Sequence, residues 1–402
     1  MLIGNSENRR IQFLLDAVRK AQGKERSGIE VSVEVLTYEE LLSSANLSDL
    51  LARKFLYYAQ KHSFERLVIK LESPGENFSI EKALIIRGAL LCEQLDNQGV
   101  AYPKLDDLVF DQGKIIYLRE WFFGYKSFLE SLENALAELA GQYPIELLNS
   151  PKSVIQLFDK PQCLDVLANS GIAVPKRLPK FESYAELKRQ MTLLNCYRVF
   201  VKLSYGSSAS GVIALQVNPR LGKVKATTSI EAVETKHGIT LYNSLKIRTY
   251  TDERTVARIV DRLIPEEIYA EQWIPKAQLG KENFDIRLVL MDGRACHRLF
   301  RSSHSPITNL HLGNKKRYEN DFDKGPEYIR LSSVVAKSAG KLFPQARNIG
   351  FDILISQRAK KPVIIEMNAF GDLLPTASFM GKNIWDYQVE LFSKNKAQVS
   401  EY

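Results

Sequence analysis

The residues best suited to metal chemistry lie in a predicted β-hairpin late in the chain. Two apolar runs, Phe351–Ile355 and Val363–Met367, flank a polar, basic turn, which is typical of two paired strands. Glu366 and Asn368 are two residues apart and therefore share one face of their strand, and Asp352 can face them across the pair. Two carboxylates and an amide oxygen are hard ligands that suit Mg²⁺ held together with phosphate and water.

Glu366 also has a simpler interpretation, because acidic residues at strand ends are usually solvated. Its neighbours in the sequence are Ile364, Ile365 and Met367, however, so the strand is predicted to be buried. A buried carboxylate needs a partner, and a metal ion is one candidate. From the hairpin alone, both interpretations of Glu366, a metal ligand and a solvated acidic residue, therefore remain open.

A second candidate site is the small-residue loop Ser204–Gly211, which joins two predicted strands. It is neither a P-loop nor a Rossmann turn, since both of those open a helix. Its small residues would let backbone N–H groups approach phosphate oxygens, and Lys202 could reach phosphate from the preceding strand. Lys160 could do the same. The alternatives are a mobile hairpin loop and an ordinary surface lysine.

The first 150 residues alternate between strand and helix patterns, which predicts a parallel sheet covered by helices. Short loops follow two of the strands. Asn5-Ser6 could touch a ligand, but we expect it to cap the next helix. Ser73–Glu76 is interpreted first as a turn and second as a substrate loop. The predicted strands are 1–4, 31–36 and 66–71, and the predicted helices are 7–21, 50–59 and 80–93.

Beyond a proline-rich boundary near residue 150, helices and strands are mixed. Asp292-Gly293 between two apolar runs is a strong hairpin signal. Residues 218–250 carry few signals, and 301–326 are interpreted as a polar loop. The other predicted helices are 152–170, 185–194, 253–264, 331–343 and 385–392, and the other predicted strands are 199–203, 212–217 and 268–274.

The composition indicates a soluble, cytoplasmic protein. A chain of 402 residues is long enough for two or three globular domains. Its composition, 45% hydrophobic and 25% charged, is ordinary for a soluble protein. A net charge of +8 fits a nucleotide site, and no basic block with interleaved aromatics favours nucleic acid. The four cysteines form no CxxC pair, as in reduced cytosolic proteins. No leader-like segment and no run of about 18 apolar residues is present, so no membrane partner is expected.

Taken in order, these motifs resemble the ATP-grasp superfamily, and most of all its ligases that add glutamate to ribosomal protein or related peptides. The resemblance covers residues from about 151 to 395. It implies an α/β chain that is α+β in its ATP-grasp part. A parallel-sheet pre-ATP-grasp domain (1–150) would precede a central lobe (151–275) and a C-terminal lobe carrying the metal site (276–402).

The resemblance also implies a role for each motif. Lys160 and Lys202 would contact the α- and β-phosphates of ATP, and the small-residue loop would close over the phosphates. Asp352, Glu366 and Asn368 would hold Mg²⁺, which Mn²⁺ could replace. The remaining nucleotide-binding residues would be Ser204, Gly206, Ser207, Ser208, Gly211, Glu271, Gln272 and Ile274, and the catalytic residues Arg287, Arg301 and Asn309.

The implied reaction is ATP-dependent ligation through an acyl phosphate, with a small-molecule or peptide carboxylate and an amine as substrates. A phosphotransferase or a non-catalytic nucleotide-binding regulator remains as an alternative. Ile307 and Asn314 replace an arginine and a glycine of the glutamate ligases, and AFGDLLP follows Asn368 instead of their Pro-Gly turn. The acceptor is therefore left open, although His304 and His311 could help to bind it. A homodimer is plausible by frequency alone.

Overall fold

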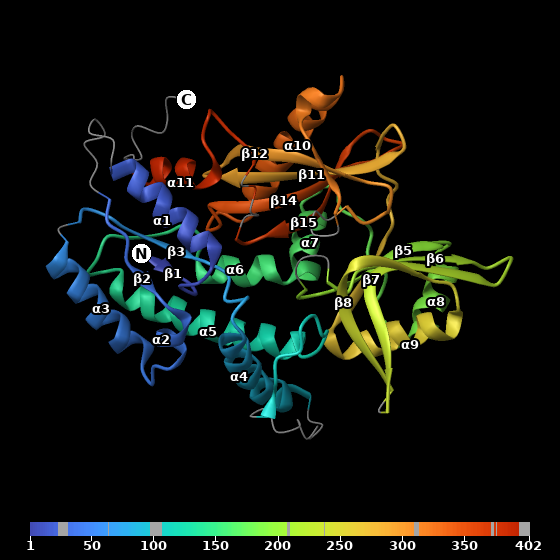
Figure 1. The fold of residues 1–402 in the computed structure, drawn as a ribbon, viewed down its shortest axis with the longest axis horizontal. Helices are drawn as coiled ribbons and strands as arrows, with labels where there is room; N and C mark the ends of the chain where they lie inside the picture. Colours follow the sequence, from blue (N-terminus) through green and yellow to red (C-terminus); the bar gives the residue numbers. More distant parts are fainter. Residues whose placement is uncertain are drawn as a thin grey trace.

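The computed structural model describes residues 1–22, 31–62, 64–96, 107–206, 210–236, 238–308, 313–370, 374 and 376–393. Its strands form one parallel sheet and two antiparallel sheets, with helices packed around them (Figure 1). The predicted mixed α/β class is confirmed. Within those residues, no helix has both the length and the apolar composition needed to cross a membrane.

The parallel sheet contains the N-terminal strands in the order β2-β1-β3-β4, and all its pairings are parallel. The strands are β1 (Leu2–Ile3), β2 (Val35–Leu36), β3 (Leu67–Leu71) and β4 (Ile145–Leu147). The helices are α1 (Arg9–Gln22), α2 (Tyr38–Leu42), α3 (Leu47–Lys61), α4 (Phe78–Asp96) and α5 (Leu118–Leu139). The parallel arrangement was predicted, whereas α2 and α5 were not.

Two glycines allow α4 and α5 to cross in direct backbone contact. A Cβ atom on Gly88 would lie 1.8 Å from the carbonyl oxygen of Glu120, and one on Gly124 would lie 1.9 Å from that of Leu84. No side chain fits at either position. The close crossing brings the two helices together beneath the sheet (Figure 1).

The single helix predicted for residues 152–170 is wrong, because the chain forms two helices there, α6 (Pro151–Phe158) and α7 (Lys160–Asn169). The break lies at Asp159, whose side chain accepts a hydrogen bond from the backbone N–H of Gln162 at 3.1 Å. Pro161 follows in the first turn of α7, where its missing N–H is tolerated. The break places Lys160 at the start of a helix.

The five-stranded sheet is antiparallel, in the order β8-β7-β6-β5-β9, and forms a separate lobe with its own hydrophobic core (Figure 1). Its strands are β5 (Arg198–Leu203), β6 (Ile213–Asn218), β7 (Lys223–Thr235), β8 (Gly238–Tyr250) and β9 (Ile268–Gln272). Helices α8 (Tyr184–Leu193) and α9 (Glu253–Leu263) pack on it, followed by a 3-10 turn at Ile264–Glu266. The long pair β7–β8 occupies the region to which the sequence assigned no element.

The C-terminal sheet has the order β13-β12-β11-β14-β15, with β10 paired to β11. Asp292 and Gly293 both have positive φ, 46° and 73°, as a tight two-residue turn requires, so the predicted hairpin is confirmed. The strands are β10 (Gln278–Leu279), β11 (Glu282–Met291), β12 (Arg294–Ser303), β13 (Lys315–Arg317), β14 (Asn348–Ile355) and β15 (Pro362–Asn368). A 3-10 turn (Glu319–Asp321) and helix α10 (Gly325–Gly340) complete this region. The predicted loop over 301–326 therefore contains the end of β12, all of β13 and the start of α10.

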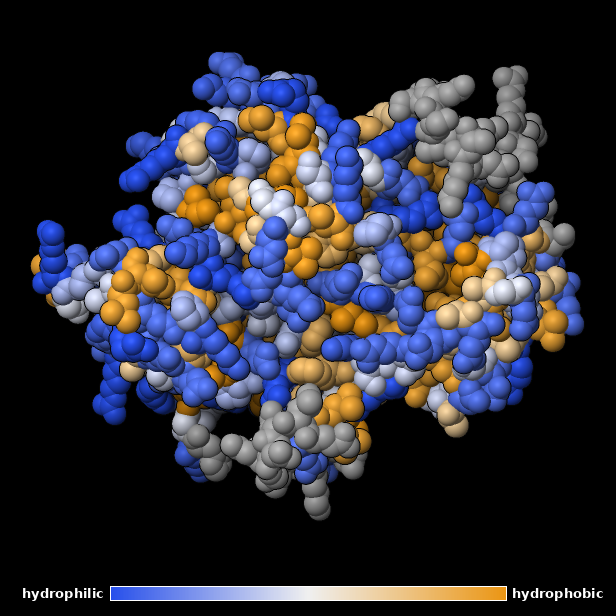
Figure 2. Space-filling view, turned by 180° about the vertical axis from the view of Figure 1, so that it is seen from behind, coloured by the Kyte–Doolittle hydropathy of each residue, from blue (hydrophilic) through white to orange (hydrophobic). Residues whose placement is uncertain are grey.

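The last helix, α11 (Ile384–Ser393), packs against α1, and the ring centroids of Phe13 and Trp385 are 4.5 Å apart. Lys70 of β3 also donates a hydrogen bond to Gln388 of α11 at 3.1 Å. These contacts join the two ends of the described chain (Figure 1). On the face seen in Figure 2, hydrophilic and hydrophobic side chains are interspersed, which singles out no dimer interface there. The homodimer stays a prediction.

Candidate active site

A cleft of about 820 Å³ lies where the three sheets meet. Strands β5 and β9 contribute one wall, strands β11, β12, β14 and β15 contribute another, and the loop after β3 contributes a third. The cleft therefore collects residues that are far apart in the sequence, and most of the predicted site residues lie in it.

The predicted acidic hairpin forms one part of this wall. Asp352 lies directly opposite Glu366 in the pairing of β14 with β15, and Asn368 lies opposite Gly350. The side chains of Asp352, Glu366 and Asn368 all line the cleft. In the described part of the chain, no three His, Cys, Asp or Glu side chains are grouped closely enough to hold a metal by themselves. The available donor set is thus two carboxylates and one amide, which leaves positions for phosphate and water.

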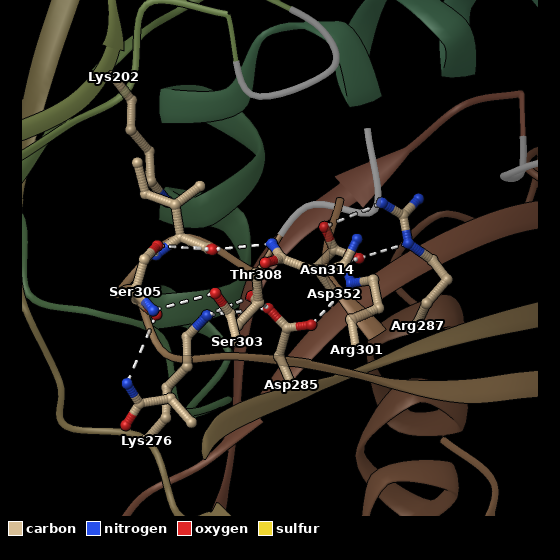
Figure 3. Close-up of polar contacts among 12 residues, drawn as sticks. Lys202, Lys276, Asp285, Arg287, Arg301, Ser303, Ser305, Thr308, Asn314 and Asp352 are labelled. Carbon is tan, nitrogen blue, oxygen red and sulfur yellow. Dashed lines mark hydrogen bonds and ion pairs between the residues drawn. The ribbon is translucent and has the colours of Figure 1, made fainter. Parts of the chain in front are cut away.

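Two arginines hold the Asp352 carboxylate. Arg287 Nε lies 2.5 Å from Asp352 Oδ1, and Arg301 Nη2 lies 3.0 Å from the same oxygen. Arg301 also donates from Nε to Asp285 Oδ1 at 2.7 Å. Arg301 is therefore clamped between two acidic side chains, Asp285 on the neighbouring strand and Asp352 on β14 (Figure 3).

The network continues to two residues that the sequence analysis did not single out. Lys276 Nζ donates to Asp285 Oδ2 at 2.9 Å and to Thr308 Oγ1 at 2.7 Å, and the Thr308 hydroxyl also donates to Asp285 Oδ2 (Figure 3). All three residues are buried and line the cleft. A signal for Lys276 was present, because it lies between Ile274-Pro275 and Ala277, the same kind of apolar surroundings that drew attention to Lys202.

Burial and pairing set the charge states of this network. Burial alone would raise the pKa of Asp285, but the charges of Arg301 and Lys276 lower it well below its usual range. Burial lowers the pKa of Lys276, and Asp285 opposes that shift. Burial disfavours the charge of Arg301, but Asp285 and Asp352 more than compensate and raise its pKa. Asp285 thus stays ionised and Arg301 stays charged next to the cleft.

The two predicted phosphate lysines approach the cleft from the other side. Lys160 Nζ lies 3.6 Å from Glu366 Oε1 and donates a hydrogen bond to the carbonyl oxygen of Gly206. Lys202 on β5 forms an ion pair with Glu271 on the adjacent strand β9. Glu271 is 2% exposed, and burial raises its pKa although Lys202 opposes the shift. Each lysine therefore neutralises an acidic side chain of the cleft.

The small-residue loop connects β5 to β6, and its described ends explain two of its glycines. A Cβ atom on Gly211 would lie 2.4 Å from Leu203 Cδ1, and Gly211 also has a φ of +67°. A Cβ atom on Gly206 would lie 2.9 Å from Leu203 Cβ. Larger residues would displace the loop from the end of β5. Gly206 lines the cleft, and so does Ser210.

No protein-family model matches the sequence, and no curated protein matches it. Among solved structures, D-cycloserine synthetase DcsG is 14% identical, with a TM-score of 0.51 over 98% of this chain and 99% of that chain. The ATP-grasp ligase PsnB, complexed with a phosphomimetic variant of its minimal precursor, Mg and ADP, is 14% identical (TM-score 0.49; 97% of this chain, 96% of that chain). The macrocyclase MdnC from Microcystis aeruginosa MRC, bound with precursor peptide MdnA, is 12% identical (TM-score 0.47; 97% and 98%). The chain has the ATP-grasp fold. At these identities, the likeness concerns the fold alone.

Most residues that the ATP-grasp resemblance singled out line the same cleft. They are Lys160, Lys202, Gly206, Glu271, Gln272, Ile274, Arg287, Arg301, Asp352, Glu366 and Asn368. Ser204 and Gly211 are described but do not line it: the backbone of Ser204 is bonded to Glu267 and Lys160. Ser207, Ser208, Asn309 and His311 lie outside the described residues, and His304 interacts instead with Glu282 at 3.5 Å. The assigned roles remain predictions.

The N-terminal part of the fold contributes a wall of the cleft, at the loop for which the sequence predicts a turn first and a substrate loop second. Ser73, Gly75 and Glu76, in the loop after β3, line the cleft. The expected cap at Asn5-Ser6 is wrong: Asn8 accepts the N–H of Arg10 at 2.9 Å, whereas Asn5 Nδ2 donates to the Pro74 carbonyl oxygen at 2.9 Å. Asn5 therefore supports the Ser73–Glu76 loop rather than a helix.

Proposed function

We propose that this protein is an ATP-dependent carboxylate ligase, which activates a carboxylate as an acyl phosphate for attack by an amine or another nucleophile and releases ADP and phosphate. One observation supports this most strongly. The acidic hairpin, the Arg287–Arg301 network and the lysines of two other elements line one cleft in a chain with the ATP-grasp fold. A site for phosphoryl transfer needs these charge types together.

The nucleotide would lie between β9 and the acidic hairpin. Lys160 and Lys202 would contact the α- and β-phosphates, with the 204–211 loop covering them. Glu271, Gln272 and Ile274 would border the adenine, beside apolar side chains from two walls of the cleft. Phe200, Leu203, Val212, Leu354 and Ile365 supply that apolar surface. An apolar slot with a few polar groups is typical of a site for a planar base.

Asp352, Glu366 and Asn368 would hold Mg²⁺, and their oxygen donors fit that ion better than a soft metal. Bound Mg²⁺ would neutralise phosphate charge and polarise the transferring phosphoryl group. Mn²⁺ prefers similar ligands and could replace it. In the structure Arg287 lies 2.5 Å from Asp352 and Lys160 lies 3.6 Å from Glu366, so each carboxylate has a basic neighbour before any ligand binds.

The chain's own residues would supply the remaining steps. A carboxylate is a poor electrophile, so its oxygen first takes the γ-phosphoryl group; the amine then attacks the acyl carbon and phosphate leaves. Arg287 and Arg301 would stabilise the negative charge of the transferring group, and Asn309 would lie near it. Closure of the loop would keep water from hydrolysing the acyl phosphate. No side-chain nucleophile takes part.

In this proposal, residues 1–150 would bind substrate, while 151–275 and 276–402 would form the two ATP-grasp lobes. The substrates would be a small-molecule or peptide carboxylate and an amine, handled in the cytoplasm. Ile307, in place of the arginine of the glutamate ligases, argues against carrying over their acceptor.

The first test is the melting temperature of the protein with Mg·ADP and with ADP plus EDTA. Ligand at about a hundred times its Kd stabilises the folded state by roughly 2.7 kcal/mol, which is readily measured. A rise that requires Mg²⁺ supports the proposal, and no rise at saturating nucleotide would refute it. A substrate screen for phosphate release then separates ligation, in which phosphate leaves free, from phosphotransfer, in which it stays on the product.

A further inference from the structure

The N-terminal wall of the cleft has charges of its own. Besides the small residues of the 73–75 turn, it contributes one basic side chain, Arg10, and two acidic side chains, Glu76 and Glu81. None of the three belongs to the nucleotide and metal residues described above. They come from other elements of the fold than the proposed phosphate ligands, so this wall could bind a second molecule.

The loop that carries Glu76 is held in place by hydrogen bonds, and Glu81 lies on the helix α4 that follows it. Asn5 Nδ2 donates to the carbonyl oxygens of Pro74 and Gly75 at 2.9 Å and 3.3 Å. The Glu76 N–H donates to Glu81 Oε1 at 3.1 Å, and Asn77 Nδ2 donates to Glu7 Oε1 at 2.5 Å. The loop is therefore fixed to α4 and to the segment before α1, which pre-organises it for binding.

Arg10 lies next to a buried ion pair formed by Lys70 and Glu72. Glu72 is 1% exposed and pairs with Lys70, which in turn reaches Gln388 on α11. The other carboxylate oxygen of Glu72, Oε2, makes no hydrogen bond within the described residues, and it lies 4.0 Å from Arg10 Nη1. This buried carboxylate oxygen is thus an acidic neighbour of Arg10, and Arg10 lines the cleft whereas Glu72 does not. The carboxylate holds the guanidinium group at the cleft wall.

The acidic pair lacks a positive partner. In the phosphate region each lining acid has a basic side chain within 4.0 Å: Lys202 for Glu271, Lys160 for Glu366, and arginines for Asp285 and Asp352. Among the described residues, neither Glu76 nor Glu81 has one. Burial raises the pKa of Glu81, and the charge of Glu76 adds to the shift. A bound cation would relieve this repulsion.

We propose that this wall binds a substrate with both a primary ammonium and a carboxylate group, whose ammonium lies against Glu76 and Glu81 and whose carboxylate lies against Arg10. A free amino acid and a short unprotected peptide share this chemistry. The inference rests on the proposed function, for which it names the class of one substrate. Glu72 acts as a positioning residue, because it holds Arg10.

The test is calorimetric titration of the whole protein, with and without Mg·AMP-PNP. The probes are the standard amino acids in both enantiomers, simple dipeptides such as glycylglycine, and the N-acetyl and carboxamide derivatives of each. We expect at least one free compound to bind, and both derivatives to bind at least about tenfold more weakly, because a charged hydrogen bond contributes about 1.5–3 kcal/mol. Whether an amino acid or a dipeptide binds shows which of the two is the substrate class.

Variants assign the binding to this wall. Arg10→Gln and Glu81→Gln should each weaken binding about tenfold. Glu72→Gln should weaken it less, and its difference from the wild type should disappear for the carboxamide derivative, which lacks the carboxylate that Arg10 would bind. Arg9→Gln and Glu93→Gln, exposed on the same helices, serve as matched controls and should bind as wild type.

Two outcomes would overturn the inference. One is that no free amino acid or dipeptide binds the wild type. The other is that the derivatives, or the Arg10 and Glu81 variants, bind equally well. Mg·ADP stabilisation is measured on the same samples. If Mg·ADP stabilises the protein but no amino acid binds, only this inference is overturned. If Mg·ADP does not stabilise the protein, the proposed function is overturned instead.

Discussion

Asp352 and Glu366 occupy directly opposite positions on β14 and β15, and each faces a basic residue from another part of the fold. Arg287 lies 2.5 Å from Asp352, and Lys160 lies 3.6 Å from Glu366. Two acidic side chains this close together are stable only because cations from β11 and α7 balance them. Once phosphates bind Lys160, Glu366 would lose its basic partner, and the two carboxylates would then favour a divalent cation.

Glu366→Gln is expected to abolish the Mg²⁺-dependent part of ADP binding, because it removes one of two carboxylate donors. Loss of a group that merely supports a metal ligand weakens metal binding roughly 10–100-fold, and loss of the ligand itself should exceed that. Titration calorimetry with Mg·ADP measures the effect. Glu327→Gln, exposed on α10, is the control. Unchanged affinity in Glu366→Gln would remove the metal assignment.

Lys202→Met is expected to lower the free energy of unfolding by about 3 kcal/mol, because it leaves Glu271 buried without its cation. The double variant Lys202→Met/Glu271→Gln should recover most of this stability, yet both variants should bind ADP weakly. Urea denaturation and calorimetry measure the two effects separately. If the double variant regains nucleotide affinity together with stability, Lys202 is a structural residue and no phosphate ligand.

Asp285→Asn is expected to destabilise the fold by about 3–5 kcal/mol, because Arg301 and Lys276 both depend on this carboxylate. Thr308→Val removes only a neutral hydroxyl from the same network and should cost about 1–3 kcal/mol. Urea denaturation should rank the variants in that order, with the exposed Asp323→Asn near wild type. Equal losses at Asp285 and Thr308 would contradict the charge-based account.

Glu282→Gln tests the electrostatics of the sheet edge. Hydrogen bonds from Lys315 and Ser302, at 2.7 Å and 2.8 Å, lower the pKa of Glu282 from 4.5 to about 2. A carboxylate with a lowered folded-state pKa stabilises the protein above its unfolded-state pKa, and this stability is lost as the pH falls through the folded-state value.

The wild type should therefore be more stable than Glu282→Gln at neutral pH, and the difference should shrink between pH 4.5 and about 2. Urea denaturation over that range gives the difference directly. The exposed Glu65→Gln is a control that should lack this pH dependence. A constant difference for Glu282→Gln would mean that its contribution is steric.

Gly88→Ala tests the α4–α5 crossing. The added Cβ would lie 1.8 Å from the backbone oxygen of Glu120, which cannot move without shifting α5, so we expect a loss of about 3 kcal/mol or more. Gly141→Ala is the matched control, because no atom lies within 4 Å of a Cβ there, and its effect should stay within about 0.5 kcal/mol. Thermal unfolding measures both. Tolerance of alanine at Gly88 would show that the helices can separate.

Sequence alone predicted the elements whose signals are local. The β14–β15 hairpin follows from two apolar runs and a polar turn, and the β11–β12 hairpin follows from Asp292-Gly293. Strands β7 and β8 were missed because their pattern mixes threonine and charged residues. Their stability depends on pairing with each other and with β6, which no local window of the sequence reveals.

The sequence also determined which residues could do chemistry: Asp352, Glu366 and Lys202 stood out because charged groups in apolar runs need partners. Which partners they have was decided only by the tertiary structure. Lys276, Asp285 and Thr308 meet because the segment after β9, strand β11 and the segment after β12 come together. Strand and turn patterns depend on neighbouring residues, whereas a buried charge is balanced through space, by whichever segment the fold brings within hydrogen-bonding distance.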